Sequence, residues 1–411
     1  MARGGKFLVL VCLMGGLLWL GIRSTLASRA SEPLDKVRAP VKTAGVDSSQ
    51  IYPPHEGPPS CGSPWSSGCF DRSRCLGAEG TPQLSMYVHD GSCSNMRSAD
   101  IMAKSVTDGD CGSVCNAALA LVRQRAKAKG LLAETPGTAC LIVYGLRTGH
   151  RCVSRTPTWE NGRNHLIIDF NDQQRYAFPD VFGSVAMFAS SNMQSSYYRA
   201  GYDIALPLPP KKVFEHLAVT PPMARKYFLT FKGHFYMSGG GFTERGATLQ
   251  IAAESGSPDV VIVENCQESH KEHLLPENLE HCEDLMEKFS QQDYADLMNT
   301  TFALVPAGRS PATFRLGEVL SAGAIPVFLH KSFVKPFPSR IPWHLCSFSF
   351  PIEEASTIIE TLRGVPEQTL EEMKTVCLQA YNDYFKGRIS VITDTTLDIL
   401  DNRLAFRSER P

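Results

Sequence analysis

The sequence lacks an excess of charge of either sign. Its 411 residues hold 41 Lys and Arg against 42 Asp and Glu, which gives a formal net charge of -1. No broad electrostatic field therefore attracts nucleic acid or an acidic polymer, and neither is expected as a partner. An anionic ligand has to be bound by local clusters of basic residues. Internal repeats and low-complexity tracts are lacking as well, and the hydrophobic content of 43% is that of globular domains.

Long hydrophobic runs are scarce, and one stands out at the amino terminus. Residues 7–22 are uncharged and follow Arg3 and Lys6. The run is close to the shortest length that spans a bilayer, and the preceding positive charges predict a cytoplasmic amino terminus. We expect a single-pass type II membrane protein with a lumenal body. A cleaved signal peptide ending near Ala27 is the alternative, and it sends the body to the same lumen.

Cysteine is not scarce, and its number fits an oxidising lumen. Apart from Cys12 in the hydrophobic run, the sequence holds an even dozen. Disulfides are the natural interpretation in a secretory chain. We predict the pairs Cys69–Cys75 and Cys266–Cys282, because each flanks a short loop.

Two further short motifs bear on the lumenal assignment. Cys111 and Cys115 have a spacing that zinc ligands use, but no matching Cys or His pair follows, so no metal is expected. Asn299 begins an Asn-Thr-Thr sequon, which predicts N-glycosylation in the lumen.

The remaining chain alternates short hydrophobic runs with longer helical stretches. This alternation is typical of βαβ units and a parallel sheet. Expected strands lie at 84–88, 139–146, 165–170, 227–231, 260–264, 302–305 and 325–329. Prolines at 207–210 and 221–222 interrupt the pattern, which predicts two Rossmann-like domains in series. The predicted parts are a cytoplasmic tip and signal-anchor (1–23), a stem (24–60), an acceptor domain (61–215), a donor domain (216–385), and a C-terminal helix and tail (386–411).

The segment 304–320 carries the strongest chemical signal. A hydrophobic strand ends at Pro306, and Ser310 followed by Pro311 predicts an N-cap and the start of a helix that reaches Ser321. Free backbone N–H groups at such a helix start bind diphosphates in open α/β sheets. Arg309 stands beside this predicted site.

Arg315 and Glu318 lie three residues apart on that helix and share a face. One interpretation is an exposed ion pair of little energetic value. The functional interpretation is that Glu318 accepts hydrogen bonds from two ribose hydroxyls, while Arg315 steadies it or meets phosphate.

A second anion-binding loop is predicted after the strand at 227–231. Lys232 and Gly233 follow the strand, and the glycine-rich residues 238–241 lead into a helix that begins near Arg245. Glycine-rich loops also occur as plain linkers, so this signal is weaker.

Several of these segments together resemble the exostosin domain of animal heparan-sulfate polymerases. The resemblance covers roughly residues 60–405. It rests on residues 225–233, on Cys266 and Cys282, on residues 299–306, 315–320 and 326–327, and in the first half on residues 69–75 and 159–165.

The resemblance implies an inverting, Golgi-resident glycosyltransferase with a GT-B fold, in which two Rossmann-like domains face each other across a cleft. It implies a UDP-sugar donor without a cofactor or metal, a glycan acceptor, and for the closest relatives transfer of glucuronic acid through a β1,4 bond. The implied donor-site residues are Arg245, Arg309, Ser310, Arg315 and Glu318, and the predicted anion-binding loop adds Lys232 and Gly233. His165 is the first choice for the catalytic base, ahead of Asp90 and Glu160, with a hydrogen-bonded structural histidine as the alternative.

Two departures from the polymerases keep other functions open. The polymerases continue into a second transferase domain, whereas this sequence ends soon after Leu404, so we do not expect it to alternate two sugars alone. Basic residues at 147–151 stand where acidic ones are expected. The main alternative is a catalytically silent GT-B subunit in an oligomer with an active glycosyltransferase. A lectin-like binder is a weaker alternative, because the arginines near the predicted diphosphate site argue against it.

Overall fold

The computed structural model describes residues 65, 67–77, 80–89, 112–145, 158–170, 182, 185–235, 242–266, 286–308, 310–329 and 332–404. All belong to the unit Pro40–Pro411, which is considered by itself. The other unit, Met1–Ala39, contains the predicted anchor and lies outside the described residues. Within the described ranges no helix is both long and apolar enough to cross a bilayer.

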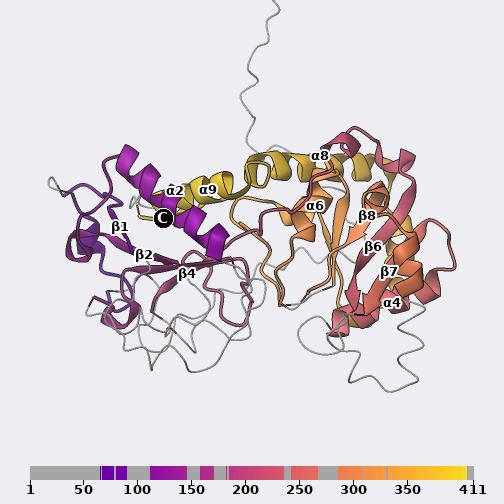
Figure 1. The fold of residues 1–411 in the computed structure, drawn as a ribbon, viewed down its shortest axis with the longest axis horizontal. Coiled ribbons are helices and arrows are strands. Elements are labelled where there is room, and N and C mark those ends of the chain that lie inside the picture. The colour runs from indigo at the N-terminus through magenta and orange to yellow at the C-terminus, as the bar shows by residue number, and fades with distance from the viewer. Residues whose placement is uncertain are drawn as a thin grey trace, which may run out of the picture. The chain divides into compact units, whose positions relative to one another are not determined.

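The first half is built on a five-stranded parallel sheet (Figure 1). Its strands follow one another in chain order: β1 (Met86–Val88), β2 (Leu141–Gly145), β3 (His165–Asp169), β4 (Met187–Ser190) and β5 (Ile204–Ala205). Strands β2, β3 and β4 are buried along their whole length, as their nearly continuous hydrophobic sequences require. Helix α2 (Gly112–Ala128) connects β1 to β2.

The second half holds another five-stranded parallel sheet, in the order β10-β9-β8-β6-β7. The strands are β6 (Tyr227–Phe235), β7 (Val260–Cys266), β8 (Thr300–Leu304), β9 (Ile325–Phe328) and β10 (Phe348–Ser349). Helices α4 (Phe242–Ser255), α6 (Arg315–Ser321) and α7 (Ile358–Arg363) belong to this half. The strand order reverses at β6, since β7 lies on one side of it and β8 on the other.

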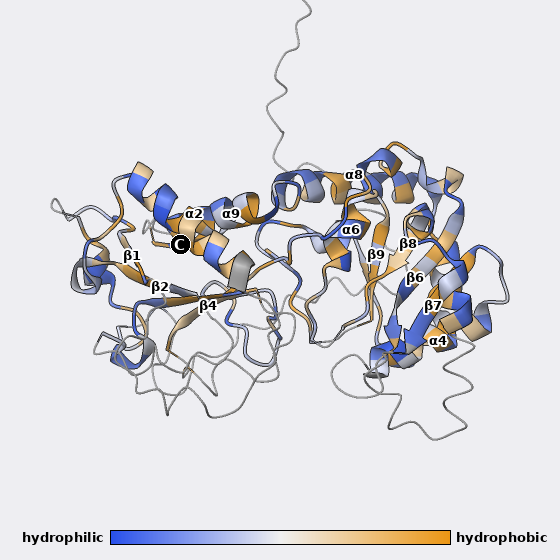
Figure 2. Cartoon of the chain, in the orientation of Figure 1, coloured by the Kyte–Doolittle hydropathy of each residue, from blue (hydrophilic) through white to orange (hydrophobic). Residues whose placement is uncertain are grey.

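The last two helices join the halves. Helix α8 (Glu367–Tyr384) belongs to the second half, and α9 (Arg388–Leu404) returns along α2 of the first (Figure 1). Arg125 on α2 forms an ion pair with Asp394 on α9, with a distance of 2.8 Å. Figure 2 shows hydrophobic and hydrophilic residues alternating along both helices, as expected for helices with one buried face.

Backbone hydrogen bonds also tie the two halves together. Val334 N–H donates to Met193 O over 3.0 Å, and Phe337 N–H donates to Ala205 O over 2.9 Å. Short 3₁₀ helices fill the remaining connections: Arg72–Cys75, Pro136–Thr138, Glu160–Gly162, Glu215–Leu217, Pro222–Ala224, Asp296–Met298, Trp343–Leu345 and Ile352–Thr357.

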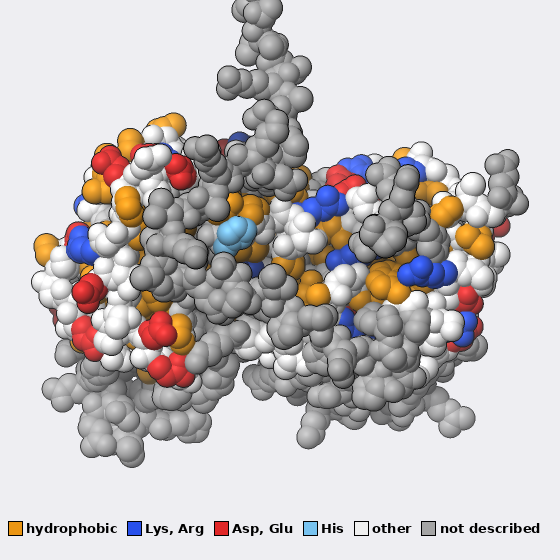
Figure 3. Space-filling model, turned by 180° about the vertical axis from the view of Figure 1, so that it is seen from behind, with side chains coloured by type: hydrophobic (Ala, Val, Ile, Leu, Met, Phe, Trp, Pro, Cys, Tyr) orange, Lys and Arg blue, Asp and Glu red, His pale blue; other side chains and the backbone are white. Residues whose placement is uncertain are grey.

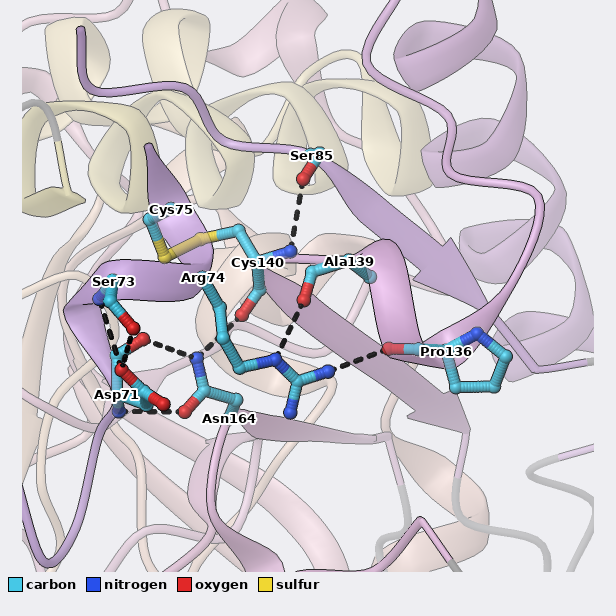
Figure 4. Close-up of a disulfide and its surroundings, with 9 residues drawn as sticks. All are labelled: Asp71, Ser73, Arg74, Cys75, Ser85, Pro136, Ala139, Cys140 and Asn164. Carbon is cyan, nitrogen blue, oxygen red and sulfur yellow. Dashed lines mark hydrogen bonds between the residues drawn. A yellow bond between two sulfur atoms is a disulfide. The ribbon is translucent and has the colours of Figure 1, made fainter. Parts of the chain in front are cut away.

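A disulfide closes the amino end of the first sheet (Figure 4). Cys75 is bonded to Cys140, just before β2, and the predicted pair Cys69–Cys75 is therefore wrong. The neighbouring segments explain the choice: Asn164 Nδ2 donates to Cys140 O over 2.7 Å, and Asn164 Oδ1 accepts the Asp71 N–H. This network brings the 3₁₀ turn that ends at Cys75 against β2 and β3, an arrangement that loop length alone does not reveal.

Further cysteines of the described residues are also disulfide-bonded. Cys346 and Cys377, which the sequence did not single out, form a second disulfide. Cys69 and Cys115 are disulfide-bonded as well. The predicted partner of Cys266, Cys282, lies outside the described residues, so that pair stays a prediction.

Candidate functional site

The reversal of strand order at β6 marks the place to look for a ligand. In open α/β sheets, ligands bind at the carboxyl ends of the strands where neighbouring connections leave in opposite directions. Here β6 continues through α4 to β7, whereas β8 continues through α6 to β9. The carboxyl ends of β6 and β8 therefore define the candidate site.

Arg245, on the first turn of α4, reaches into this position. The side chain is buried, with 6% of its surface exposed. Its Nε donates to Ala307 O over 2.9 Å, and its guanidinium lies 4.6 Å from the centre of the Phe231 ring. A Cβ atom on Gly233 would collide with Arg245 Nη1. Gly233 therefore leaves the space that the Arg245 side chain occupies, and a larger residue at position 233 would displace the arginine.

Arg315 enters the same region from α6 and joins the end of β8 to the middle of β6. Its Nε donates to Leu304 O over 2.8 Å, and its Nη2 donates to Thr230 O over 3.3 Å. Its guanidinium also lies over Phe231, 5.0 Å from the ring centre. Two arginines from different helices therefore contact the same phenylalanine of β6.

Glu318 is linked to Arg315 through a tyrosine. The Tyr294 hydroxyl donates to Glu318 Oε2 and accepts from Arg315 Nη1, and Lys212 N–H donates to Glu318 Oε1 over 3.1 Å. Burial raises the pKa of Tyr294, which keeps it a donor. Only 7% of Arg315 and 5% of Glu318 are exposed, so the alternative of an exposed ion pair is wrong. A carboxylate accepts more bonds than these donors supply, which leaves capacity for hydroxyl groups.

Lys232 points away from this cluster, because neighbouring residues in a strand face opposite sides. Its Nζ donates to Phe289 O over 2.8 Å and to Gln292 O, and lies over the Phe289 ring. Desolvation lowers its pKa. Lys232 therefore lies on the opposite face of β6 from Gly233 and Arg245. Its ammonium group binds the backbone at Phe289 and Gln292, in the segment that precedes β8.

The predicted helix start at Pro311 is wrong, and Ser310 is not its N-cap. Helix α6 begins at Arg315, and Thr313 Oγ1 accepts the Arg315 N–H over 3.2 Å. The preceding chain turns back on itself, with Gly308 N–H donating to Ser310 O. Ala312 N–H donates to Asn192 Oδ1 over 3.3 Å, so this amide already has a partner in the first half. Ser310 is buried in this turn, and Arg309 lies outside the described residues.

His165 lies at the opposite end of its sheet. It is the first residue of β3, is 1% exposed, and its Nδ1–H donates to Arg163 O over 2.9 Å. Its ring packs edge-on against Trp159, and burial lowers its pKa to about 4. This is the environment of the structural histidine that the sequence also allowed. Asp90 lies outside the described residues.

Two buried carboxylates at strand ends were not among the predicted site residues. Asp169 closes β3 and accepts a hydrogen bond from Ser190 Oγ over 3.1 Å. Glu264 lies near the end of β7 and accepts one from Thr248 Oγ1 over 2.6 Å. Both have 0% exposure. An acidic residue that closes a hydrophobic strand run was the available signal.

The remaining predicted features are a metal and a glycan. No group of three potential metal ligands occurs in the described part of the chain. Asn299 is half-buried just before β8, and its carbonyl accepts the Tyr227 N–H over 3.1 Å. Its glycosylation stays a prediction. On the face seen in Figure 3, acidic and basic side chains occur together, without one field of a single sign.

Comparisons with known proteins agree with this architecture. Residues 124–365 match the exostosin GT47 domain. The chain is 29% identical over 297 residues to Exostosin-1 of Drosophila melanogaster, covering 66% of this chain and 38% of that protein. It is 27% identical over 305 residues to the Exostosin-1 homolog of Caenorhabditis elegans, covering 67% and 78%. The chain thus spans well under half of the insect relative.

Among solved structures, a glycosyltransferase from Rickettsia africae aligns with a TM-score of 0.37 and 9% identity, covering 73% of this chain and 84% of that one. Two parallel Rossmann-like sheets in series, with the last helix returning to the first half, make a GT-B architecture, as the sequence predicts. Because the matched domain covers more than half of its length, the chain belongs to the exostosin GT47 family.

Proposed function

We propose that the chain transfers a sugar from a UDP-sugar donor to a glycan acceptor, and that the carboxyl ends of β6 and β8 bind the donor. The arrangement that carries this proposal is the convergence of Arg245 and Arg315 on Phe231 at the point where the strand order reverses, with Glu318 linked to Arg315 through Tyr294. Nucleotide sites of α/β proteins occupy this place.

The residues divide the work of donor binding. The guanidinium of Arg245, held next to the chain that follows β8, meets the diphosphate and stabilises the charge that develops on it as UDP leaves. The remaining acceptor capacity of Glu318 receives the ribose hydroxyls. Tyr294 holds that carboxylate in place, because its hydroxyl donates to Glu318 Oε2. Arg315 in turn holds Tyr294, because its Nη1 donates to the same hydroxyl. Inversion also requires a base for the acceptor hydroxyl.

For the donor sugar and the bond formed, we propose glucuronic acid and a β1,4 linkage with inversion, which rests on the family resemblance. A panel of UDP-sugars offered to the purified lumenal fragment, scored by thermal shift and UDP release, tests this choice. Release with UDP-glucuronic acid and an acceptor supports it. UDP binding without release for any donor favours the catalytically silent subunit.

The role of Glu318 can be tested with a matched pair of variants. Glu318→Ala removes charge-assisted hydrogen bonds worth about 1.5–3 kcal/mol each, so UDP affinity should fall at least about tenfold. Tyr294→Phe removes only the hydroxyl between Glu318 and Arg315, and should keep UDP affinity within about threefold. Calorimetric titration, with melting curves as a folding control, measures both. Equal UDP binding by a folded Glu318→Ala variant would contradict the site.

We further propose that the protein is anchored in the Golgi membrane with its body in the lumen. The disulfides Cys75–Cys140 and Cys346–Cys377 support an oxidising compartment. Membrane fractionation of the untagged protein, combined with enzymatic removal of the glycan expected at Asn299, tests the assignment. Recovery in the culture medium with an amino terminus near Ser28 would contradict the anchor.

A further inference from the structure

Glu264 is a buried carboxyl group that the donor-binding arrangement does not yet use. It has 0% exposure and lies on β7, beside the candidate site. One oxygen, Oε1, accepts the Thr248 hydroxyl over 2.6 Å. The other, Oε2, is buried and accepts no hydrogen bond from any residue that the structure describes. A fully buried carboxyl with one empty acceptor is costly when ionised.

Glu264 lies next to Arg245 through the register of the sheet. Its Cα pairs with that of Gly233 on β6, and paired residues of neighbouring strands face the same side. Arg245 Nη1 occupies the space over Gly233 that a side chain would fill. Thr248 joins the two residues from α4, because its hydroxyl contacts both Glu264 Oε1 and Arg245 O. The buried carboxyl and the guanidinium therefore lie on the same face of the sheet, on either side of Gly233.

Few other titratable groups lie around Glu264 among the residues that the structure describes. Of these, Arg245 is the charged group that acts on it electrostatically. Glu244, also on the first turn of α4, is buried, and burial raises its pKa. From β6, Lys232 and His234 both lie against Phe289. The charge state of Glu264 is thus set mainly by burial and by Arg245.

We propose that Glu264 is a positioning residue that couples donor binding to proton uptake: it releases Arg245 to the diphosphate only when its own carboxyl is protonated. The proposal rests on the proposed function, since it requires a diphosphate at Arg245. An ionised Glu264 competes with the diphosphate for the arginine, and two anions in one buried site repel each other. Protonation of Glu264 removes both the competition for Arg245 and the repulsion between the two anions. The proton comes from solvent.

The charge balance around Glu264 places the effect in an accessible pH range. Burial raises the pKa of Glu264 to about 7, while Arg245 and the Thr248 hydroxyl act in the opposite direction. When a diphosphate takes over Arg245 and adds negative charge, the pKa of Glu264 rises further. Near pH 7 the free protein is partly ionised and the complex is protonated, so binding takes up as much as about half a proton.

Proton uptake can be measured directly. UDP is titrated calorimetrically into the wild-type protein at pH 7 in two buffers of different ionisation enthalpy. The matched variant is Glu264→Gln, which is neutral at every pH. A terminal phosphate itself releases a proton near pH 6, so the variant supplies the baseline for UDP. We expect an uptake in the wild type that exceeds the baseline by about 0.3–0.5 proton.

The pH dependence of affinity gives a second readout. If the protonated form alone binds, the wild type loses about tenfold in affinity at pH 8 relative to Glu264→Gln, and the two converge at pH 6. Glu254→Gln, an exposed change at the far end of α4, should behave as the wild type. UDP binding with equal proton uptake in wild type and Glu264→Gln would overturn the coupling while sparing the donor site. Failure of the wild type to bind UDP at either pH would overturn both proposals.

Discussion

The two halves of the molecule treat buried charge in different ways. In the first half, Arg199 and Asp203 form a bidentate ion pair with distances of 2.8 and 2.7 Å and almost no exposure. In the second half, Arg315 directs its guanidinium to carbonyl oxygens and a hydroxyl, and Glu318 accepts from a hydroxyl and a backbone N–H. Arg199 and Asp203 neutralise each other, so this pair stabilises the fold. Arg315 and Glu318 are separated by the neutral Tyr294 hydroxyl, so both charged groups can still interact with a ligand.

Breaking the ion pair of the first half should have the largest effect. Asp203→Ala leaves Arg199 charged and buried, which costs about 3–5 kcal/mol. The double change Arg199→Met with Asp203→Leu removes both charges and should recover much of this loss. Urea unfolding of the three proteins measures the difference. Equal stability of Asp203→Ala and wild type would show that the pair contributes little.

The disulfides sharpen the same contrast between scaffold and site. Replacing Cys75 and Cys140 by alanine should lower the free energy of unfolding by about 2–4 kcal/mol, without weakening UDP binding to the folded protein. The bond Cys75–Cys140 closes a loop of 65 residues and Cys346–Cys377 one of 31. Chain entropy therefore makes the first bond more stabilising by about 0.6 kcal/mol. Unfolding of the two double variants in parallel tests this order.

Glu264 provides an opposite prediction, because removing its charge should stabilise the protein. Its raised pKa means that the native state keeps a proton which the unfolded state, near the ordinary value of 4.5, has released. Stability therefore falls as the pH rises from 4.5 to about 7, and the penalty is complete above that range. Glu264→Gln should gain on the order of 3 kcal/mol at pH 8 and nearly nothing at pH 4. A constant difference across this range would contradict the assignment.

Sequence patterns predicted the two parallel sheets because hydrophobic strand runs are local features. Strands such as β3 and β8 lie within one or two residues of their predicted positions. The short strand β5 carried too few residues to form a pattern. The disulfide partner of Cys75 depends on how the segment around Asp71 lies against β2 and β3, and such tertiary contacts leave no local trace.

The places of the candidate residues in the fold were predicted more accurately than their contacts. Arg245 follows β6 and Glu318 follows β8, as the sequence predicts, because a glycine-rich turn and the end of a hydrophobic strand run are local patterns. Their part in donor binding stays a prediction. The start of α6 was missed because Ser310 and Pro311 have the chemistry of a helix start, whereas the Ala312 amide is taken by Asn192 from the other half. Likewise, no local pattern shows that Lys232 faces Phe289.

The central claim is that Arg245 marks a UDP site, and one titration tests it most directly. Arg363 is a matched control: it also lies over a phenylalanine of β6, 4.0 Å from the Phe228 ring centre, but at the amino end of that strand and paired with Asp259. We predict that Arg245→Gln weakens UDP binding about 10–100-fold, while Arg363→Gln leaves it unchanged. Equal dissociation constants for wild type and a folded Arg245→Gln variant would contradict the account.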